Sequence, residues 1–267
     1  MLPSSLTLVG AGKMGGAMLS GWLRAGLDPA GTTVIDPSPS PETKAVCAQH
    51  GVALNPPNLE PADVLVLAVK PQGLADAAPA LAPVVGPGTL VLSILAGKTI
   101  ADIAARLPTT AVVRAMPNLP ASIGRGVTGA VASAGVSPRQ RAQADALLAC
   151  VGLVEWLDQE VLIDALTAVS GSGPAYVFHL VEALAEAGCA AGLPRDMADR
   201  LARATVTGAG ALLDGDPREA ARLRRDVTSP GGTTAEALAV LMREDGLAKL
   251  MREAVAAAAR RAGELSG

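Results

Sequence analysis

The feature that most constrains the fold is a set of three closely spaced glycines near the start of the chain, Gly10, Gly12 and Gly15. They follow the short apolar run from Leu6 to Val9 and precede a segment with helical spacing that ends at Gly26. The order is therefore strand, turn and helix. In this context G-x-G-x-x-G lets the backbone approach a pyrophosphate at the helix N-terminus. A tight turn of purely structural role is the alternative. We expect a dinucleotide-binding loop made of Gly10, Ala11, Gly12, Lys13, Met14 and Gly15.

Short apolar runs with helical patterns between most of them continue through the first half of the chain. The runs that predict further strands are Thr32 to Ile35, Val64 to Val69, Leu90 to Ile94, Ala111 to Arg114 and Gly129 to Ala132. Strands that alternate with helices indicate an α/β fold with a parallel, doubly wound sheet, whose ligand lies at the carboxyl ends of the strands.

The pattern changes after about Gly152, where long helical stretches rich in alanine and leucine replace the alternation. These stretches are 164 to 191, 195 to 213 and 235 to 264. We therefore expect two domains, a dinucleotide-binding domain over residues 1–158 and an all-α domain over residues 159–267.

Composition narrows the classes of function. Half of the residues are apolar but very few are aromatic, so the core must consist of Ala, Val and Leu, which favours closely packed helices and a dimer interface. A net charge of −3 gives no overall attraction to nucleic acid or to an anionic membrane. The three cysteines lie far apart without C-x-x-C spacing, which predicts neither a metal site nor disulfides. The longest apolar stretch, 77 to 97, is broken by prolines. We expect a soluble, cytoplasmic protein.

An acidic residue, Asp36, ends the second predicted strand. It could accept hydrogen bonds from the adenosine ribose and would then favour NAD, whereas Ser38 and Ser40 could hold a 2′-phosphate. That loop contains no arginine. The choice between NADH and NADPH stays open at this point.

Three more segments follow predicted strands at the same edge of the sheet. Ala68-Val69-Lys70-Pro71 and Leu95-Ala96-Gly97 lie where the ribose and nicotinamide would run, although each could be a connecting turn. Asn118 follows the fifth strand, where its amide could meet the nicotinamide, but Pro117-Asn118 is also ordinary turn chemistry.

A second anion site is predicted in the C-terminal half, at Ser229-Pro230-Gly231-Gly232-Thr233-Thr234. This segment offers hydroxyls and free backbone N–H groups where a helix begins, and such a start binds anions. Thr233 and Glu236 also fit a capping box, so simple capping is the alternative. Two adjacent glycines exceed what a cap requires and favour a carboxylate site.

The residues that are missing also bear on the chemistry. Residues 152 to 246 contain no lysine, and the only histidines are His50 and His179. Many dehydrogenases that act on alcohols use Lys or His to move the hydroxyl proton. A substrate with a protonated C=N bond needs little acid help, and the Thr234 hydroxyl could stabilise or protonate its nitrogen. The run Ser170 to Tyr176 is not a G-x-S-x-G elbow, because Val169 precedes it, so no hydrolase is indicated.

At these motifs the chain resembles the Δ1-pyrroline-5-carboxylate reductases, and the resemblance covers essentially its whole length. The matching segments are Gly10 to Gly15, Ala68 to Pro71, Ala115 to Asn118, Val169 to Tyr176 and Val227 to Thr234. The last of them is highly specific. The resemblance implies an N-terminal Rossmann domain, a C-terminal helical domain that dimerises with a second subunit, and reduction of 1-pyrroline-5-carboxylate to L-proline with NADPH or NADH.

The resemblance also implies residue roles. Ser229, with Gly231 and the backbone N–H groups of Gly232 and Thr233, would hold the substrate carboxylate, and Thr234 would lie near the ring nitrogen as the catalytic residue. Asn58 would line the cofactor together with the segments that follow the strands. Asp36 is a place of variation in the family and weakens any transfer of the family's usual NADPH preference. Six-membered cyclic imines are an open alternative as substrates, because an extra methylene changes binding by only about 1 to 3 kcal/mol.

Two other functions fit parts of the same pattern. A reductase of the same two-domain plan that acts on a 3-hydroxy acid is disfavoured by the missing lysine. A non-catalytic dinucleotide sensor would bind NAD(P)H without oxidising it, but has no evident need of a second anion loop.

Overall fold

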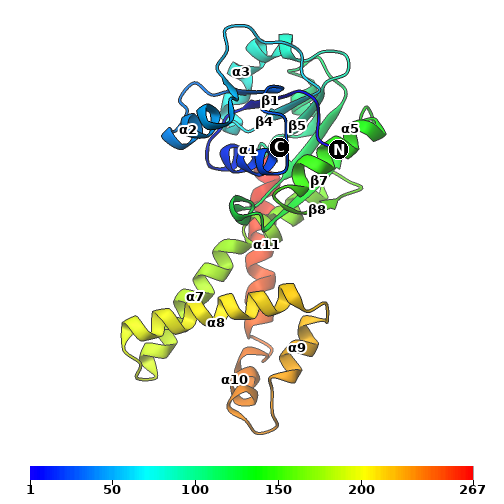
Figure 1. Ribbon diagram of the computed structural model, residues 1–267. Helices are drawn as coiled ribbons and strands as arrows, with labels where there is room; N and C mark the ends of the chain where they lie inside the picture. Colours follow the sequence, from blue (N-terminus) through cyan, green and yellow to red (C-terminus); the bar gives the residue numbers. More distant parts are fainter. Residues whose placement is uncertain (267) are drawn as a thin grey trace. The chain divides into compact units, whose positions relative to one another are not determined.

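The structure, a computed structural model, describes residues 1–266 and contains two compact units (Figure 1). The first consists of Met1–Gly171 together with the stretch that starts at Ala258, and the second of Ser172–Ala257. From the sequence we expect a boundary between two functional domains after residue 158, and that boundary stays a prediction, because the compact units are defined by packing alone. Residues 159–171 lie with the first unit because Ile163 and Ala168 are buried in it.

An eight-stranded sheet forms the centre of the first unit, with strand order β3-β2-β1-β4-β5-β6-β7-β8. The strands are β1 Leu6–Val9, β2 Thr32–Ile35, β3 Ala53–Leu54, β4 Val64–Leu67, β5 Leu90–Ser93, β6 Val112–Met116, β7 Gly126–Ala132 and β8 Gly152–Trp156. β1 and β2 have the predicted limits. The prediction of a doubly wound α/β sheet is confirmed.

The expectation of a purely parallel sheet is wrong at one edge, because β7 pairs antiparallel with β6. Only the short 3-10 helix η3, Leu119–Ile123, lies between them, and a parallel crossover needs a dozen or more residues. β8, which pairs parallel with β7, was missed by the sequence analysis. It is a five-residue edge strand that is only partly buried, so its apolar signal is weak.

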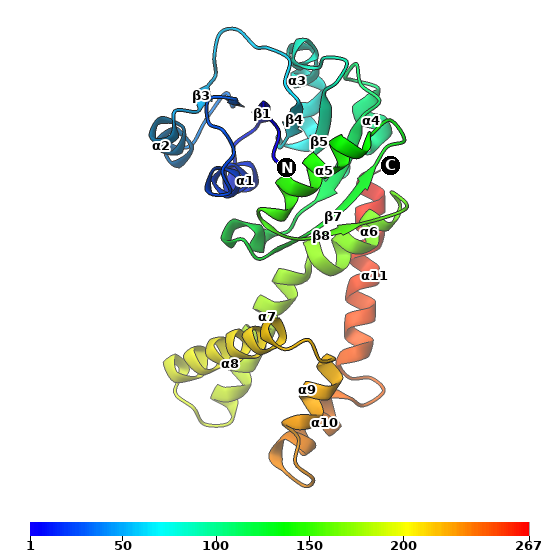
Figure 2. The ribbon, with the colours of Figure 1, turned by 45° about the vertical axis from the view of Figure 1, so that its right-hand side comes forward.

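Helices cover both faces of the sheet (Figure 2). The helices of this unit are α1 Lys13–Arg24, α2 Pro41–His50, α3 Leu74–Leu81, α4 Ile100–Ala104, α5 Pro138–Ala149 and α6 Leu162–Leu166. Alternate residues of the buried strands serve the two faces: Val64 and Val66 pack with α1, α2 and α5, whereas Leu65 and Leu67 pack with α3 and α4. Because both faces are apolar, the strands read as near-continuous hydrophobic runs.

The second unit is helical, as predicted, with more breaks than the sequence suggests. It contains α7 Gly173–Ala190, α8 Arg195–Gly215, α9 Ala220–Asp226, α10 Thr233–Leu241 and the first part of α11 Leu247–Ser266. The stretch 164 to 191 is divided by a π-helical turn, η4 Thr167–Gly171, and Pro174 stands in the first turn of α7. The stretch 235 to 264 is divided near Gly246, where a Cβ would collide with the Leu241 carbonyl oxygen.

The core of this unit is very small. Its buried apolar residues are Ala185, Ala198 and Ala202, with Val181 and Cys189 packed against them. No helix in the described part of the chain is long and apolar enough to span a membrane.

Candidate active site

The parallel strands bring most of the predicted cofactor residues to one edge of the sheet. β1, β2, β4, β5 and β6 run in the same direction, so the residues after them share the carboxyl edge. Those residues are Gly10, Asp36, Ala68, Ala96 and Asn118. The strand order reverses between β1 and β4, which is where ligands bind in such sheets.

The glycine loop has a separate physical reason for each glycine. Gly10 has a φ of +88°, and a Cβ there would lie 2.7 Å from the Ala68 carbonyl oxygen. A Cβ on Gly15 would collide with the Gly10 carbonyl oxygen, so this glycine lets α1 lie close to β1. Gly12 precedes α1 and has open space where a Cβ would point. A tight turn, close packing and an open approach are what a pyrophosphate at a helix N-terminus requires. The loop fits a dinucleotide.

Asp36 is held rigidly beside this loop. Its Oδ2 accepts a hydrogen bond from the Ala11 N–H at 2.8 Å, and its Oδ1 accepts one from the Ser38 N–H at 2.8 Å. Asn55 donates from Nδ2 to the Asp36 carbonyl at 2.7 Å and accepts from the Asp36 N–H at 2.9 Å. Asn55 escaped the sequence analysis. Its φ of +51°, which only the structure shows, lies in the left-handed region that Asn tolerates better than most residues.

The start of α2 lies against the same loop. The Ser40 hydroxyl caps this helix by accepting from the Thr43 N–H at 3.1 Å, and the Thr43 hydroxyl donates to the Ala11 carbonyl at 2.9 Å. Hydrogen bonds from its own backbone N–H and from Ser40 lower the pKa of the exposed Glu42 carboxyl, which is therefore ionised at neutral pH.

The other predicted cofactor residues differ in exposure. Lys70, Ala96 and Asn58 are exposed, whereas Val69 and Pro71 are half-buried. Gly97 has a φ of +70°, and a Cβ there would lie 2.5 Å from the Leu265 carbonyl oxygen. The end of α11 therefore packs directly on the predicted nicotinamide segment.

Asn118 is buried, and both ends of its amide are engaged. Its Oδ1 accepts from the Val127 N–H at 2.9 Å, and its Nδ2 donates to the carbonyl and the hydroxyl of Ser170 at 3.1 and 3.2 Å. Asn118 therefore ties the π-helical turn to β7. Its contact with the nicotinamide stays a prediction.

A buried ion pair that sequence reasoning missed lies behind this edge. The Arg114 side chain, 5% exposed, donates from Nη1 to Glu160 Oε1 at 2.9 Å, and the Ile100 N–H donates to the same oxygen at 2.8 Å. Arg114 also donates to the Ser266 hydroxyl, which donates to Asp164. The pair fixes the start of α4, just after the 95–97 segment, to the end of α11.

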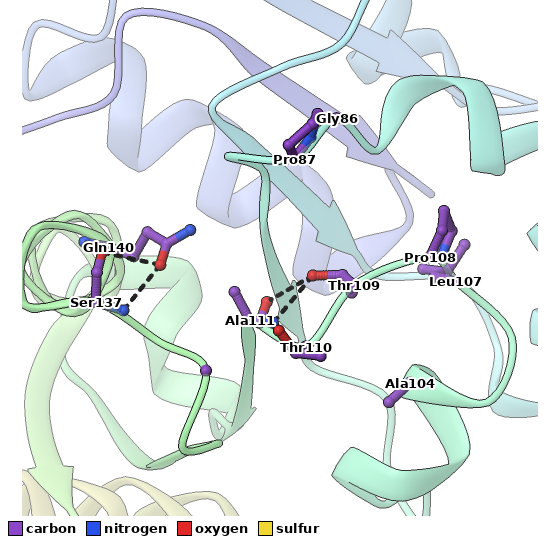
Figure 3. A pocket seen from close by; sticks show the side chains of 11 residues that line it. Gly86, Pro87, Ala104, Leu107, Pro108, Thr109, Thr110, Ala111, Ser137 and Gln140 are labelled. Atoms are coloured by element: carbon purple, nitrogen blue, oxygen red, sulfur yellow. Dashed lines mark hydrogen bonds between the residues drawn. The ribbon is translucent and has the colours of Figure 1, made fainter.

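A pocket in the same unit lies at the amino ends of the parallel strands, opposite the carboxyl ends that carry the glycine loop (Figure 3). It is lined by residues that precede β5 and β6 or adjoin the start of α5, among them Pro87, Thr109 and Ser137. These positions are at the amino ends of the parallel strands. The pocket is therefore separate from the dinucleotide loop.

In the second unit, Ser229 to Gly232 form a tight turn before α10. The Gly232 N–H donates to the Ser229 carbonyl at 3.1 Å, and Gly231 has a φ of +67°. Proline followed by such a glycine is typical of a type II turn. The alternative of a capping box is wrong, because α10 begins at Thr233 with Gly232 as its N-cap and no side-chain cap. Thr233 thus lies one position too late to cap.

The polar groups of this turn are free within the described chain. The hydroxyls of Ser229, Thr233 and Thr234 have no hydrogen-bond partner among the described residues, and neither do the Thr233 and Thr234 N–H groups. The Gly232 N–H, in contrast, is used inside the turn. Three hydroxyls and two helix-start amides at the beginning of α10 are therefore available to a ligand.

Comparison with known proteins identifies the family. The chain is 41% identical over 265 residues to the pyrroline-5-carboxylate reductase of Pseudomonas aeruginosa, covering 98% of this chain and 96% of that one. It is 40% identical to the pyrroline-5-carboxylate reductase of Synechocystis, with 97% of each chain covered. The chain belongs to the pyrroline-5-carboxylate reductase family. A model described as pyrroline-5-carboxylate reductase dimerisation matches residues 160–265. A model described as NADP oxidoreductase coenzyme F420-dependent matches residues 5–97.

Solved structures agree with this assignment. A pyrroline-5-carboxylate reductase from Coxiella burnetii matches with a TM-score of 0.92 and 36% identity over 99% of each chain. The Plasmodium falciparum pyrroline carboxylate reductase, solved with NADP bound, matches with a TM-score of 0.81, but at 24% identity it speaks for the fold alone. The resemblance noted in the sequence is thereby confirmed, including the Rossmann-type domain and the helical domain that follows it.

Proposed function

We propose that this chain reduces 1-pyrroline-5-carboxylate to L-proline with NADPH or NADH, the last step of proline biosynthesis. The observation that carries the proposal is the start of α10, where hydroxyls and backbone N–H groups have no partners among residues 1–266. Such a helix start attracts a carboxylate through its dipole and its free donors. The family assignment supplies the substrate class.

The dinucleotide would be held by the carboxyl edge of the sheet. The glycine loop, 10 to 15, would bind the pyrophosphate, and Asp36 with Ser38 would meet the adenosine ribose. Asn58, the segment 68 to 71, Ala96, Gly97 and Asn118 would line the remainder. When bound, the reduced nicotinamide supplies a hydride.

The substrate would be held by the turn and first residues of α10. Ser229 and the Thr233 and Thr234 N–H groups are the free donors for its carboxylate, while Gly231 and Gly232 shape the turn that presents them. The Thr234 hydroxyl would stabilise the ring nitrogen. As C5 of the imine gains the hydride, the C=N electron pair moves to that nitrogen, which keeps its proton and becomes the amine of proline.

Because the iminium carbon is already electrophilic, the protein's main task is to hold the two reactants in line. Proximity and orientation alone can supply about 7 to 11 kcal/mol of a reaction barrier. A strong acid at the nitrogen is then unnecessary, which fits a site with a threonine and no lysine.

The helical unit would bury its exposed apolar side chains by homodimerisation. Large apolar side chains are exposed along α7, α8 and α10, including Phe178, Leu201 and Val240. A core of three alanines is too small for a unit of this size, and exposed apolar faces mark interaction surfaces. All three cysteines are free thiols, which suits a reducing compartment, and we place the enzyme in the cytoplasm.

The proposal is tested by mixing purified protein with pyrroline-5-carboxylate and either NADPH or NADH, and by following the absorbance of the reduced nicotinamide. Rapid oxidation that depends on the imine is the expected result. Binding of a dinucleotide without oxidation would instead favour the sensor. A 3-hydroxy acid with NAD(P) serves as the substrate control and is expected to give no turnover.

Gly232→Ala is expected to lower kcat/KM for the imine about tenfold or more, which corresponds to about 1.4 kcal/mol. A Cβ at this position would lie 2.5 Å from the Ser229 Oγ and 3.1 Å from the Ser229 carbonyl oxygen, so the carboxylate donor must move. NAD(P)H binding should be unchanged. Gly88→Ala makes the same chemical change where nothing lies within 4 Å, and should leave kcat/KM as in the wild type. An unchanged Gly232→Ala enzyme would contradict the role of the turn.

Thr234→Ala is expected to lower kcat at saturating imine by about tenfold, because it removes one hydrogen bond at the ring nitrogen, worth about 1.4 kcal/mol. Thr234→Ser keeps the hydroxyl and should retain most of the turnover. Steady-state kinetics with both variants separates the loss of a hydroxyl from the loss of a methyl group. Equal kcat for the wild type and Thr234→Ala would remove the threonine from the mechanism.

A further inference from the structure

The loop between β2 and α2 carries a carboxylate that cannot turn away from the dinucleotide. Asp36 has each oxygen on a different backbone N–H, those of Ala11 and Ser38, and its own backbone is held at both polar atoms by Asn55. Rotating the carboxylate away would break two hydrogen bonds at once, the one from the Ala11 N–H in the glycine loop and the one from the Ser38 N–H. Asp36 is therefore a fixed negative charge beside the pyrophosphate-binding turn.

The other groups of this loop offer little to an additional anion. The Ser40 hydroxyl is engaged by the Thr43 N–H and lies 3.2 Å from the Thr43 hydroxyl. Glu42, in the first turn of α2, adds a second carboxylate to the groove that the glycine loop shares with α2. Ser38 is exposed, and its hydroxyl is the one uncommitted side-chain donor in the segment 36 to 40.

Cations are present nearby, but on another element. Residues 25 to 43 contain no lysine or arginine. Lys13 and Arg24 line the same groove from the first and last turns of α1, and Lys44 is exposed on α2. Lys13 adjoins the turn that would bind the pyrophosphate, which NADH and NADPH share, so it does not discriminate between them.

The two cofactors differ at the 2′ position of the adenosine ribose, where NADH has a hydroxyl and NADPH has a phosphate. A 2′-hydroxyl can donate to a carboxylate oxygen, which has lone pairs left after one N–H bond. A 2′-phosphate carries about −1.5 to −2 charges near neutral pH and has acceptor oxygens only, so it repels a carboxylate that cannot move. The place of this carboxylate therefore decides which cofactor is preferred, since Asp36 directly follows β2, where the adenosine ribose lies in such folds.

We propose that Asp36, locked by Ala11, Ser38 and Asn55, makes this enzyme prefer NADH over NADPH. The inference rests on the proposed function for its turnover measurements, but not for its binding measurements. Asp36 is a specificity-determining residue that also braces the glycine loop.

The test compares Kd and kcat/KM for NADH and NADPH in three proteins. Fluorescence titration of each reduced cofactor gives Kd without any substrate. The wild type is expected to bind NADH about tenfold more tightly, a factor equal to 1.4 kcal/mol. S38R adds a guanidinium beside the ribose and should shift the ratio of the two Kd values towards NADPH by about tenfold or more.

Gln49→Arg is the matched control, because it adds the same charge on the last turn of α2, the helix that follows the Ser38 loop. It lies about 12 Å along α2 from Pro41, beyond the screening length of about 8 Å at physiological ionic strength, and should leave the ratio unchanged. A general loss of stability lowers affinity for both cofactors and does not move the ratio.

The outcomes separate the two proposals. A wild type that binds NADPH as tightly as NADH, or a ratio that S38R does not move, overturns the inference. Preferential NADH binding without imine-dependent oxidation supports the inference and overturns the proposed function alone. Binding of neither cofactor overturns both.

Discussion

Replacing Gly15 by alanine is expected to destabilise the first unit by about 3 kcal/mol and to abolish measurable NAD(P)H binding. The new Cβ would collide with the Gly10 carbonyl oxygen and lie 3.2 Å from the Ala68 Cβ. The first is a backbone atom and the second is a Cβ, so neither can rotate away as the end of a flexible side chain would. The start of α1 must therefore move off β1, which widens the turn that would hold the pyrophosphate.

Gly16→Ala is the matched control for this prediction. It makes the same change one residue later in α1, where the nearest atom to the new Cβ, the Ala11 carbonyl oxygen, is 3.4 Å away. Alanine is a better helix residue than glycine, so this variant should be as stable as the wild type or more stable by up to about 1 kcal/mol.

Urea unfolding followed by tryptophan fluorescence measures both glycine variants. The two tryptophans lie in the first unit, and Trp22 is fully buried on the affected helix. Equal midpoints for Gly15→Ala and Gly16→Ala would show that α1 can slide, and would overturn the explanation of why this position is glycine.

Replacing Glu160 by alanine is expected to lower the free energy of unfolding of the first unit by about 3 kcal/mol. The change leaves the buried Arg114 guanidinium without its carboxylate and the Ile100 N–H without an acceptor. Removing one partner of a buried ion pair costs about 3 to 5 kcal/mol. We take the lower end because the Glu160 side chain is 30% exposed and solvent screens part of its charge.

Glu160→Gln separates charge from hydrogen bonding at this position. It keeps an oxygen for the Ile100 N–H and loses only the negative charge, so its cost should be about half that of Glu160→Ala. Because the pair fixes the start of α4 just after Gly97, both variants should also weaken NAD(P)H binding. Glu160→Ala, the less stable of the two, should weaken it more than Glu160→Gln. Wild-type unfolding midpoints for both would mean that the Ser266 hydroxyl alone satisfies Arg114.

The two predictions concern different kinds of information in the chain. Gly15 belongs to a local pattern that can be read from six consecutive residues. Glu160 and Arg114 are 46 residues apart in sequence, and Ser266 lies 152 residues from Arg114. No periodicity or spacing links them, so only the folded chain brings them together.

Tertiary structure also decided features that local patterns suggested wrongly. The run 129 to 132 reads as a strand, and β7 contains it, but the direction of β7 depends on the connection before it, and a five-residue 3-10 helix cannot make a parallel crossover. Thr233 and Glu236 have capping-box spacing, but the Pro230-Gly231 turn starts the helix one residue later than a capping Thr233 requires.

The sequence by itself determined the alternation of strands and helices, the dinucleotide loop, the helical second half and the family, because each depends on short-range sterics or on a contiguous motif. It also named the polar residues of the turn before α10 and of the helix start. Only the tertiary structure decided the antiparallel edge, the role of Asn55 in locking Asp36, the double engagement of Asn118 and the buried Arg114–Glu160 pair. Each of these arises from contacts between distant segments, whose geometry is fixed by packing rather than by any neighbour along the chain.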